Sequence, residues 1–277
     1  MCRIIAIFLL CLSAAGVSLA GTLAQFRTVY GDIEVELFDV NKPVTVTNFI
    51  GYVNSGAYRD SIIHRWEPGF IIQGGGYKTT NRGTTNAILD DVNASFGTIT
   101  NEYGVGRRFS NLYGTIAMAR KAGDTNSASS QWFFNLTNNA HLDTVDGGFT
   151  VFGRVLRGTN VLEKFNDLST NSGLFRLNLD GGGPLGKIPV RSRLATYEDF
   201  VYVDISLLNV QVTRAVSGGH EISWRSVSNL VNRVEFTTLF PPAWQELTRT
   251  NGTGSEIRVT DPDPASANRF YRVRVDY

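Results

Sequence analysis

The stretch IHRWEPGFIIQGGG, residues 63–76, contains an arginine, a glutamine, short apolar segments and a run of glycines. Its apolar segments are residues 62–65 and 70–73, and similar segments follow at residues 114–119, 131–136 and 149–155, separated by Gly, Asn, Asp and Ser. Short apolar runs between turn residues predict the strands of a barrel or a sandwich. The glycines predict a tight turn, because the lysine and the spacing of a phosphate-binding loop are lacking.

The residues around these segments predict two helices and two further strands. Residues 28–39 alternate apolar and polar side chains, as in a half-buried strand. Apolar residues recur at helical spacing after Pro43, which suits a first helical turn, and this helix should end near residues 55–56. We expect a second short helix at residues 160–168 and a last strand at 201–208, with a long connection at 174–199 between them.

The pattern changes after residue 210. Apolar residues there alternate with polar partners, at Ile222/Trp224, Val234/Phe236, Ile257/Val259 and Tyr271/Val273/Val275. Several short strands without a helix predict a separate small β-sandwich. The expected division is a signal peptide at residues 1–20, a main domain at 21–209 and the small sandwich at 210–277. We expect the large aromatic residues of the sandwich in its core: Trp224, Phe236, Trp244 and Tyr271.

The first residues have the pattern of a secretory signal peptide, with Arg3, an apolar run and small residues ending at Ala20. The apolar run is shorter than the ~20 residues that a permanent membrane anchor needs. We expect cleavage after Ala20, export to the periplasm or the cell exterior, and no stable membrane insertion. Both cysteines, Cys2 and Cys11, lie within this segment, so the mature protein would contain no disulfide.

Composition and residue spacing argue against several function classes. The chain has 26 Lys and Arg residues against 25 Asp and Glu residues and no basic stripe, which argues against a nucleic-acid partner. His64, His141 and His220 lack the spacing of metal ligands, so we expect no metal and no other cofactor. A hydrolase is disfavoured because the chain has no Gly-x-Ser-x-Gly motif.

Three segments in order resemble the cyclophilin family: residues 63–76, residues 114–120 with 129–135, and residues 142–143 with 147–153. The resemblance covers residues 23–208, and the rest resembles only loosely the fibronectin-like modules of secreted bacterial proteins. It implies a mainly β fold, an eight-stranded antiparallel barrel capped by two helices, with an active groove on its outer face. It also implies a peptidyl-prolyl cis-trans isomerase (rotamase) that assists the folding of exported, proline-containing polypeptides.

The resemblance also implies roles for individual residues. Arg65 and Gln73 would be catalytic, and the substrate would contact Phe70, Ile71, Ala119, Arg120, Gln131, Phe133, His141, Leu142 and Phe149. Four of these depart from common family patterns. Ile71 replaces a frequent methionine, His141 a tryptophan and Phe149 a histidine, while Arg120 lies in a loop where many members use an asparagine. Because the imidazole of His141 offers less apolar area than an indole, cyclosporin should bind weakly.

Physical chemistry fits these residue types to the reaction. Amide resonance sets a rotation barrier of roughly 18–20 kcal/mol, so catalysis must favour the twisted amide over both planar forms. In the twisted state the proline nitrogen regains a lone pair, to which Arg65 can donate a hydrogen bond. An apolar floor of Phe70, Ile71, Phe133 and Leu142 would hold the proline ring and exclude water. No nucleophile, metal or proton transfer is required.

Two other interpretations stay open. A cyclophilin-like module could bind proline-containing segments without accelerating their isomerisation, because a fold does not guarantee turnover. Surface adhesion through the C-terminal sandwich could accompany either function. His64 is expected to be structural, since strand alternation directs it away from Arg65.

Overall fold

The computed structural model describes residues 22–92, 95–167, 169, 172–207, 210–216, 218–226, 231–239, 242–253, 255–262 and 269–276. The expected signal peptide therefore lies outside the described residues, and so do residues 208–209 at the expected domain boundary. Within the described ranges, no helix is long and apolar enough to cross a membrane.

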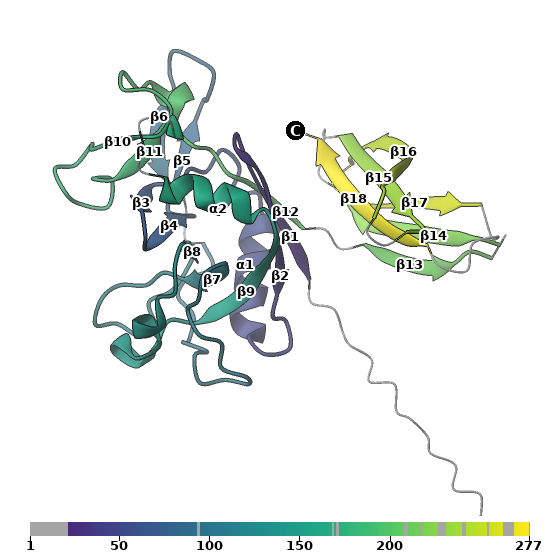
Figure 1. Ribbon diagram of the computed structural model, residues 1–277, viewed down its shortest axis with the longest axis horizontal. Helices are drawn as coiled ribbons and strands as arrows, with labels where there is room; N and C mark the ends of the chain where they lie inside the picture. The colour runs from purple at the N-terminus through teal and green to yellow at the C-terminus, as the bar shows by residue number, and fades with distance from the viewer. Residues whose placement is uncertain are drawn as a thin grey trace, which may run out of the picture.

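Eight antiparallel strands form the main sheet, in the order β12-β1-β2-β9-β7-β8-β4-β3 (Figure 1). Their bounds are β1 Leu23–Thr28, β2 Gly31–Leu37, β3 Arg65–Glu67, β4 Ile71–Gly74, β7 Thr115–Met118, β8 Trp132–Asn135, β9 Val151–Arg157 and β12 Asp204–Leu207. The sheet curls until its two ends meet. Ile63 N donates to Val201 O and Val203 N donates to Ser61 O, both at 2.9 Å. The expected eight-stranded barrel is confirmed.

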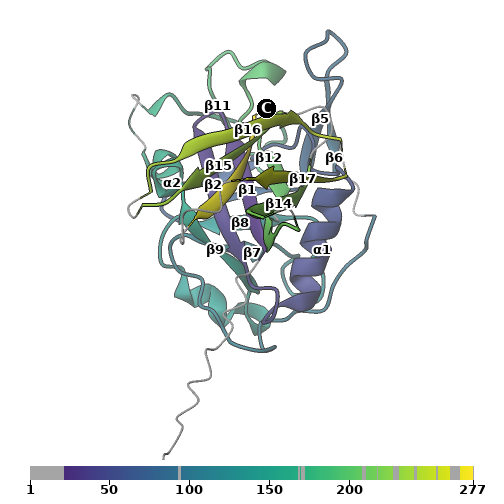
Figure 2. The same cartoon turned by 90° about the vertical axis from the view of Figure 1, so that its right-hand side faces the viewer.

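Two helices cover the barrel on either side of its strands (Figure 2). The helix predicted from Pro43 is α1 Pro43–Asn54, and the second is α2 Thr159–Asn166. Each directs one apolar face into the barrel core, α1 through Val46, Phe49 and Tyr52 and α2 through Val161, Leu162 and Phe165. Pro43 starts α1 because its missing N–H falls where a helix has no backbone acceptor.

The barrel core is rich in aromatic side chains. Phe26 meets Trp132 and Phe134 edge-on, with ring centroids 5.0 Å apart in both pairs, and all three are almost fully buried. Edge-to-face contact is a favoured geometry for aromatic pairs. Since Trp132 and Phe134 lie on β8, one face of this strand belongs to the core.

Two hairpins lie beside the barrel where the sequence indicated only loops. They are β5 Tyr77–Thr80 with β6 Ile88–Asp91, and β10 Phe175–Leu177 with β11 Ile188–Val190. The expected long connection at residues 174–199 is therefore partly a hairpin. Both hairpins pack against a second apolar cluster, whose buried members are Ile62, Ile188, Val190, Phe200 and Tyr202. Strands of three or four residues are too short to show an alternating pattern.

The C-terminal residues form two three-stranded antiparallel sheets, β13-β14-β17 and β16-β15-β18. The bounds are β13 Gln211–Arg214, β14 His220–Arg225, β15 Val231–Thr237, β16 Gln245–Asn251, β17 Glu256–Asp261 and β18 Phe270–Asp276. Ile222 and Trp224 from one sheet pack with Val234 and Val273 from the other. Both sheets thus contribute to one small apolar core.

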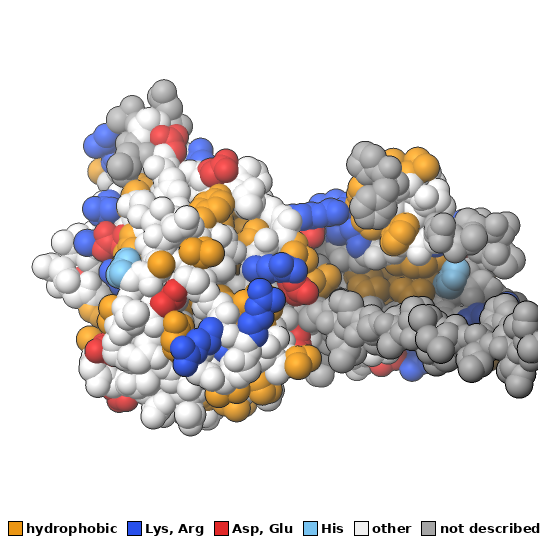
Figure 3. Space-filling view, turned by 60° about the horizontal axis from the view of Figure 1, so that its bottom comes forward, with side chains coloured by type: hydrophobic (Ala, Val, Ile, Leu, Met, Phe, Trp, Pro, Cys, Tyr) orange, Lys and Arg blue, Asp and Glu red, His pale blue; other side chains and the backbone are white. Residues whose placement is uncertain are grey.

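On the face shown in Figure 3, the described Lys and Arg side chains lie in separate groups among acidic, apolar and uncharged ones.

A buried lysine and a buried glutamate fix the start of α1 against the loop after residue 101. Lys42 Nζ donates to Glu102 O at 2.8 Å and to Val105 O at 2.5 Å. The Glu102 carboxylate accepts hydrogen bonds from Val44 N and Thr45 N, the free donors of the first helical turn. Burial lowers the pKa of Lys42, and the charge of Glu102 counteracts this effect. The charges of Lys42 and Glu102 therefore stabilise each other in their buried positions.

Replacing Glu102 with alanine should lower the free energy of unfolding by about 3 kcal/mol, because buried N–H donors and a buried ammonium lose their acceptor and counter-charge. Urea unfolding followed by circular dichroism measures the change. Glu163→Ala, on the exposed face of α2, is the matched control and should change stability by less than about 0.5 kcal/mol. Equal midpoints for the two variants would show that Glu102 does not hold the helix.

Candidate active site

A tight turn joins β3 to β4 and sets their register. Phe70 N donates to Glu67 O at 2.9 Å, and Gly69 between them has φ +69°. With Pro68 at the second position, this is the geometry of a type II turn, in which only glycine adopts the positive φ at low cost. The turn places Arg65 opposite Gln73.

The register continues across the sheet and aligns the predicted residues in one row. Gln73 on β4 lies opposite Phe133 on β8, and Phe133 lies opposite Ala117 on β7. Side chains alternate between the two faces of a strand. The neighbours of this row, such as Phe134, belong to the barrel core, so Arg65, Gln73 and Phe133 share the outer face.

An apolar cluster covers this part of the outer face. Its buried members are Ile71, Ala117, Phe133, Leu142 and Val151, and its partly buried members include Phe70, Ala119 and Phe149. The rings of Phe133 and Phe149 meet edge-on with centroids 5.8 Å apart, and His141 stacks on Phe70 at 5.8 Å. The structure thus brings together the apolar residues that the sequence assigned to the site.

Polar side chains border the apolar cluster on the side of Arg65. Gln73 Nε2 donates to Gln131 Oε1 at 2.7 Å, which fixes both amides. The side chain of Arg65 is 40% exposed. A hollow of about 390 Å³ lies here, lined by His64, Arg65, Glu67, Gln73, Tyr77, Gln131, Gly182, Gly183, Pro184 and Lys187. A charged donor therefore faces an open hollow, and Gln73, which also lines it, lies opposite Phe133 of the apolar cluster.

A buried amide and carboxylate network supports the floor, and sequence reasoning missed it. Asp143 accepts hydrogen bonds from Asn111 N and Asn111 Nδ2 at 2.9 and 2.8 Å. Asn139 Nδ2 donates to Phe70 O at 2.9 Å, and Phe149 N donates to Leu142 O at 3.0 Å. These bonds hold the short 3-10 helix Ala140–Asp143, which carries Leu142 and His141. The only sequence signal was the clustering of asparagines between apolar segments.

Arg120 lies next to the site, but its side chain is engaged elsewhere. Its Nη2 donates to Val145 O and Asp146 O, both at 2.9 Å, and its guanidinium lies 4.2 Å from the centre of the Phe149 ring. Only 3% of the side chain is exposed. The guanidinium thus fixes the loop beside Phe149, and little of the Arg120 side chain is exposed for contact with a substrate.

His64 is buried and neutral, as expected for a structural residue. Burial lowers its pKa to about 4, and its ring packs edge-on against Tyr77 at 5.0 Å. Its backbone N–H donates to Gln73 O at 3.0 Å, so it belongs to the β3–β4 pairing. A neutral imidazole in this place is no proton donor near pH 7.

Two charged residues beside Arg65 were not singled out from the sequence. Glu67 Oε1 lies 3.5 Å from Arg65 Nη2 and 2.5 Å from Lys187 Nζ. Lys187 follows the glycine-rich residues 181–183, within the long connection that the sequence predicted at residues 174–199. Its pairing with β3 spans more than a hundred residues of chain, and no local pattern could indicate it.

Comparisons with known proteins agree with this geometry. The family model described as cyclophilin type peptidyl-prolyl cis-trans isomerase/CLD matches residues 23–180. Peptidyl-prolyl cis-trans isomerase A of Dickeya dadantii is 39% identical over 162 residues, which are 58% of this chain and 79% of that protein. A peptidyl-prolyl cis-trans isomerase of Acinetobacter baylyi is 35% identical over 157 residues, 56% of this chain and 77% of that protein.

The match to a solved cyclophilin from Cryptosporidium parvum, crystallised in the presence of the dipeptide Ala-Pro, covers 67% of this chain and 98% of that chain. The two chains share 22% sequence identity, and the TM-score is 0.46. The family model spans more than half of the chain, including β3, β4 and β8, which carry Arg65, Gln73 and Phe133. The chain belongs to the cyclophilin-type peptidyl-prolyl cis-trans isomerase family.

Proposed function

We propose that this protein isomerises X-Pro peptide bonds in exported polypeptides by stabilising the twisted amide. One observation carries the proposal: the strand register sets Arg65 and Gln73 beside Phe133, at the edge of an apolar cluster. We expect a substrate with its proline ring against the cluster to place its peptide bond near Arg65, because Gln73 lies opposite both Arg65 and Phe133 in the strand register. The reaction needs these two features and no bond-forming group.

Arg65 would act on the transition state. A planar amide delocalises the nitrogen lone pair, and rotation by a quarter turn returns it to the nitrogen. A guanidinium can then donate a charge-assisted hydrogen bond that the planar forms cannot accept, worth about 1.5–3 kcal/mol. This corresponds to about one to two decades in rate. The Gln73–Gln131 pair would keep the donor and the substrate backbone aligned.

The apolar cluster would bind the proline ring in every state of the reaction. Phe133 and Ile71 are almost fully buried, whereas Phe70 and Phe149 are partly exposed. A ring held here loses water around its amide, and the less polar twisted form suffers less from that loss than the planar form. The cluster thus contributes to substrate affinity and, by excluding water, to rate, while Arg65 acts mainly on rate.

We also propose that the first 20 residues direct export and are removed, which leaves a mature protein without cysteine. The support is the basic, apolar and small-residue order of that segment. The client polypeptides would then be unfolded exported chains with slow X-Pro bonds. The intact mass of the exported protein measures the cleavage, and a retained N-terminus would contradict export by this route.

The first prediction separates catalysis from binding. Arg65→Ala should lower kcat for a proline-containing peptide at least ~10-fold, the equivalent of ~1.4 kcal/mol, while the dissociation constant changes much less. Phe133→Ala should weaken both, since the proline ring loses its pocket and water reaches the amide. Proline-limited turnover and peptide titration measure the two quantities. Circular dichroism of each variant controls for unfolding, because Phe133 also packs against the barrel.

The rival interpretation, a non-catalytic binding module, gives the opposite result. Wild-type protein would then bind proline-containing peptides without accelerating their isomerisation, and Arg65→Ala would leave this binding unchanged. Either outcome is visible in the same pair of measurements.

A second prediction concerns the two parts of the chain. We propose that residues 21–209 form the isomerase domain and residues 210–277 a separate fibronectin-like domain, because the clusters around Phe26 and around Trp224 are distinct. A chain ending at residue 209 should fold and turn over peptide at nearly the full-length rate. An insoluble or inactive product would mean that the C-terminal sheets belong to the catalytic unit.

A third prediction concerns inhibition by cyclosporin. His141 is exposed and stacks on Phe70, and an imidazole there offers less apolar area than the family's tryptophan. Cyclosporin should therefore bind weakly, and His141→Trp should tighten it at least ~10-fold, as burial of some 55 Å² or more of apolar surface would do. Calorimetric titration measures both constants. Strong binding by the unchanged protein would contradict this assignment of His141.

A further inference from the structure

A carboxylate lies beside Arg65 on the same face of β3. Glu67 is two residues further along the strand, so its side chain points to the same side. Its Oε1 lies 3.5 Å from Arg65 Nη2, and the same oxygen lies 2.5 Å from Lys187 Nζ. One carboxylate oxygen therefore joins two cations at the edge of the hollow.

The backbone fixes Lys187 in this place. Trp66 N donates to Lys187 O at 2.8 Å, and Lys187 forms a parallel bridge with Arg65. Lys187 directly precedes β11, so the hairpin continues the sheet next to β3. Arg176, on the other strand of that hairpin, donates to Trp66 O at 3.3 Å. The ammonium is thus attached to β3 by main-chain as well as side-chain contacts.

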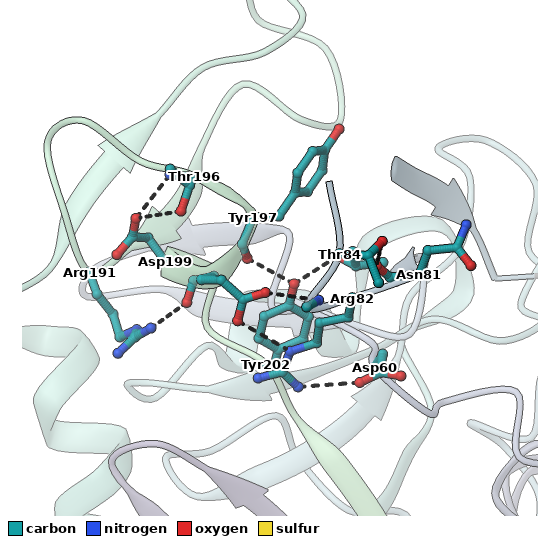
Figure 4. A network of polar contacts seen from close by, with 12 residues as sticks. Asp60, Asn81, Arg82, Thr84, Arg191, Thr196, Tyr197, Asp199 and Tyr202 are labelled. Carbon is teal, nitrogen blue, oxygen red and sulfur yellow. Dashed lines mark hydrogen bonds and ion pairs between the residues drawn. The ribbon is translucent and has the colours of Figure 1, made fainter. Parts of the chain in front are cut away.

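The hairpin in turn rests on a fixed base. Ile188 and Val190 pack with Phe200 and Tyr202 in the second apolar cluster. Figure 4 shows Tyr202 beneath Arg82, whose guanidinium lies 3.5 Å from the ring centre and binds Asp60 at 3.2 Å. These contacts limit the movement of the segment that carries Lys187.

We propose that Glu67, oriented by Lys187, is a positioning residue for Arg65 and holds the guanidinium toward the substrate amide. The inference rests on the proposed function. An arginine side chain that is 40% exposed has many rotamers, and an acceptor on its own strand reduces them before substrate binds. The guanidinium has five N–H donors, so an ion pair at one edge leaves others for the substrate.

Lys187 has a second role in this arrangement. A lone carboxylate beside Arg65 would largely neutralise it and weaken its bond to the proline nitrogen. With Lys187 present, two cations share one anion, and the group keeps a net positive charge. The partial burial of Glu67 raises the pKa of its carboxyl, but Lys187, Arg65 and Arg176 outweigh this effect and hold that pKa below its usual value.

Turnover of the mature full-length protein on a proline-containing peptide tests the proposal, with kcat and KM measured separately. Glu67→Gln should lower kcat about 3- to 10-fold with KM within about twofold. Lys187→Gln should lower kcat less, and Lys187→Arg should restore it. The matched control is Glu36→Gln on β2, since Glu36 is similarly exposed (22% against 19%) and pairs with Arg154 at 2.7 Å.

A role through Arg65 has a specific signature. In the Arg65→Ala background, adding Glu67→Gln should have no further effect, because the group to be positioned is gone. Nitrogen relaxation of the Arg65 Nε–H group gives a second readout. Its order parameter should fall in Glu67→Gln, while that of Arg154 stays constant.

Three outcomes would overturn the inference: Glu67→Gln behaving like Glu36→Gln, a further loss of rate in the Arg65→Ala background, or an unchanged order parameter for Arg65. Each leaves the proposed function standing, provided that wild type is active and Arg65→Ala is slower by the ~10-fold or more predicted above. An inactive wild type, or full activity in Arg65→Ala, would instead remove the proposed function itself.

Discussion

The pairing of β3, β4 and β8 is the constraint on which both the barrel core and the site depend. Side chains alternate along each strand, so Phe134 enters the core and Phe133 faces outward. A slip of one residue would exchange the two faces, burying a polar row that contains Gln73 and exposing the aromatic core. The free energy that holds the barrel together therefore also fixes the row of site residues. The Glu67–Phe70 turn sets this register at one end.

Much of this arrangement could be predicted from the sequence, and the remainder shows where local patterns end. The helix at Pro43 and the strands around Arg65 and Phe133 carry periodic or motif signals, and the family resemblance adds the groove. The β5–β6 and β10–β11 hairpins have strands of three or four residues and showed no alternation. Nor could residue spacing reveal that the Arg120 side chain donates to the carbonyls of Val145 and Asp146, because those acceptors belong to the backbone.

The site suits a reaction in which no proton moves. The polar side chains next to the apolar floor are Arg65, Gln73 and Gln131, residue types that keep one charge state across the physiological range. Glu67 and Lys187 pair with each other beside Arg65. The histidine beside them, His64, is buried and has a pKa of about 4. The apolar floor packs against the barrel strands, and it supplies affinity and a water-poor environment for the amide. The charge at its rim then has one task, which is to recognise a nitrogen that becomes basic only when the amide twists.

The division of the site into an apolar floor and a charged group beside it explains how such a site can vary without losing its function. Part of the floor, including Ile71, Ala117 and Phe133, lies on the strands of the sheet, and a change there disturbs the barrel. The surroundings of Arg65 are different, since β3 is the edge strand of the main sheet and its outer side is free to pair with added segments. Here the β10–β11 hairpin takes that place through Lys187. A barrel that is fixed inside can thus adjust Arg65 from outside, because the edge of β3 is the point where a new segment reaches this residue without entering the core.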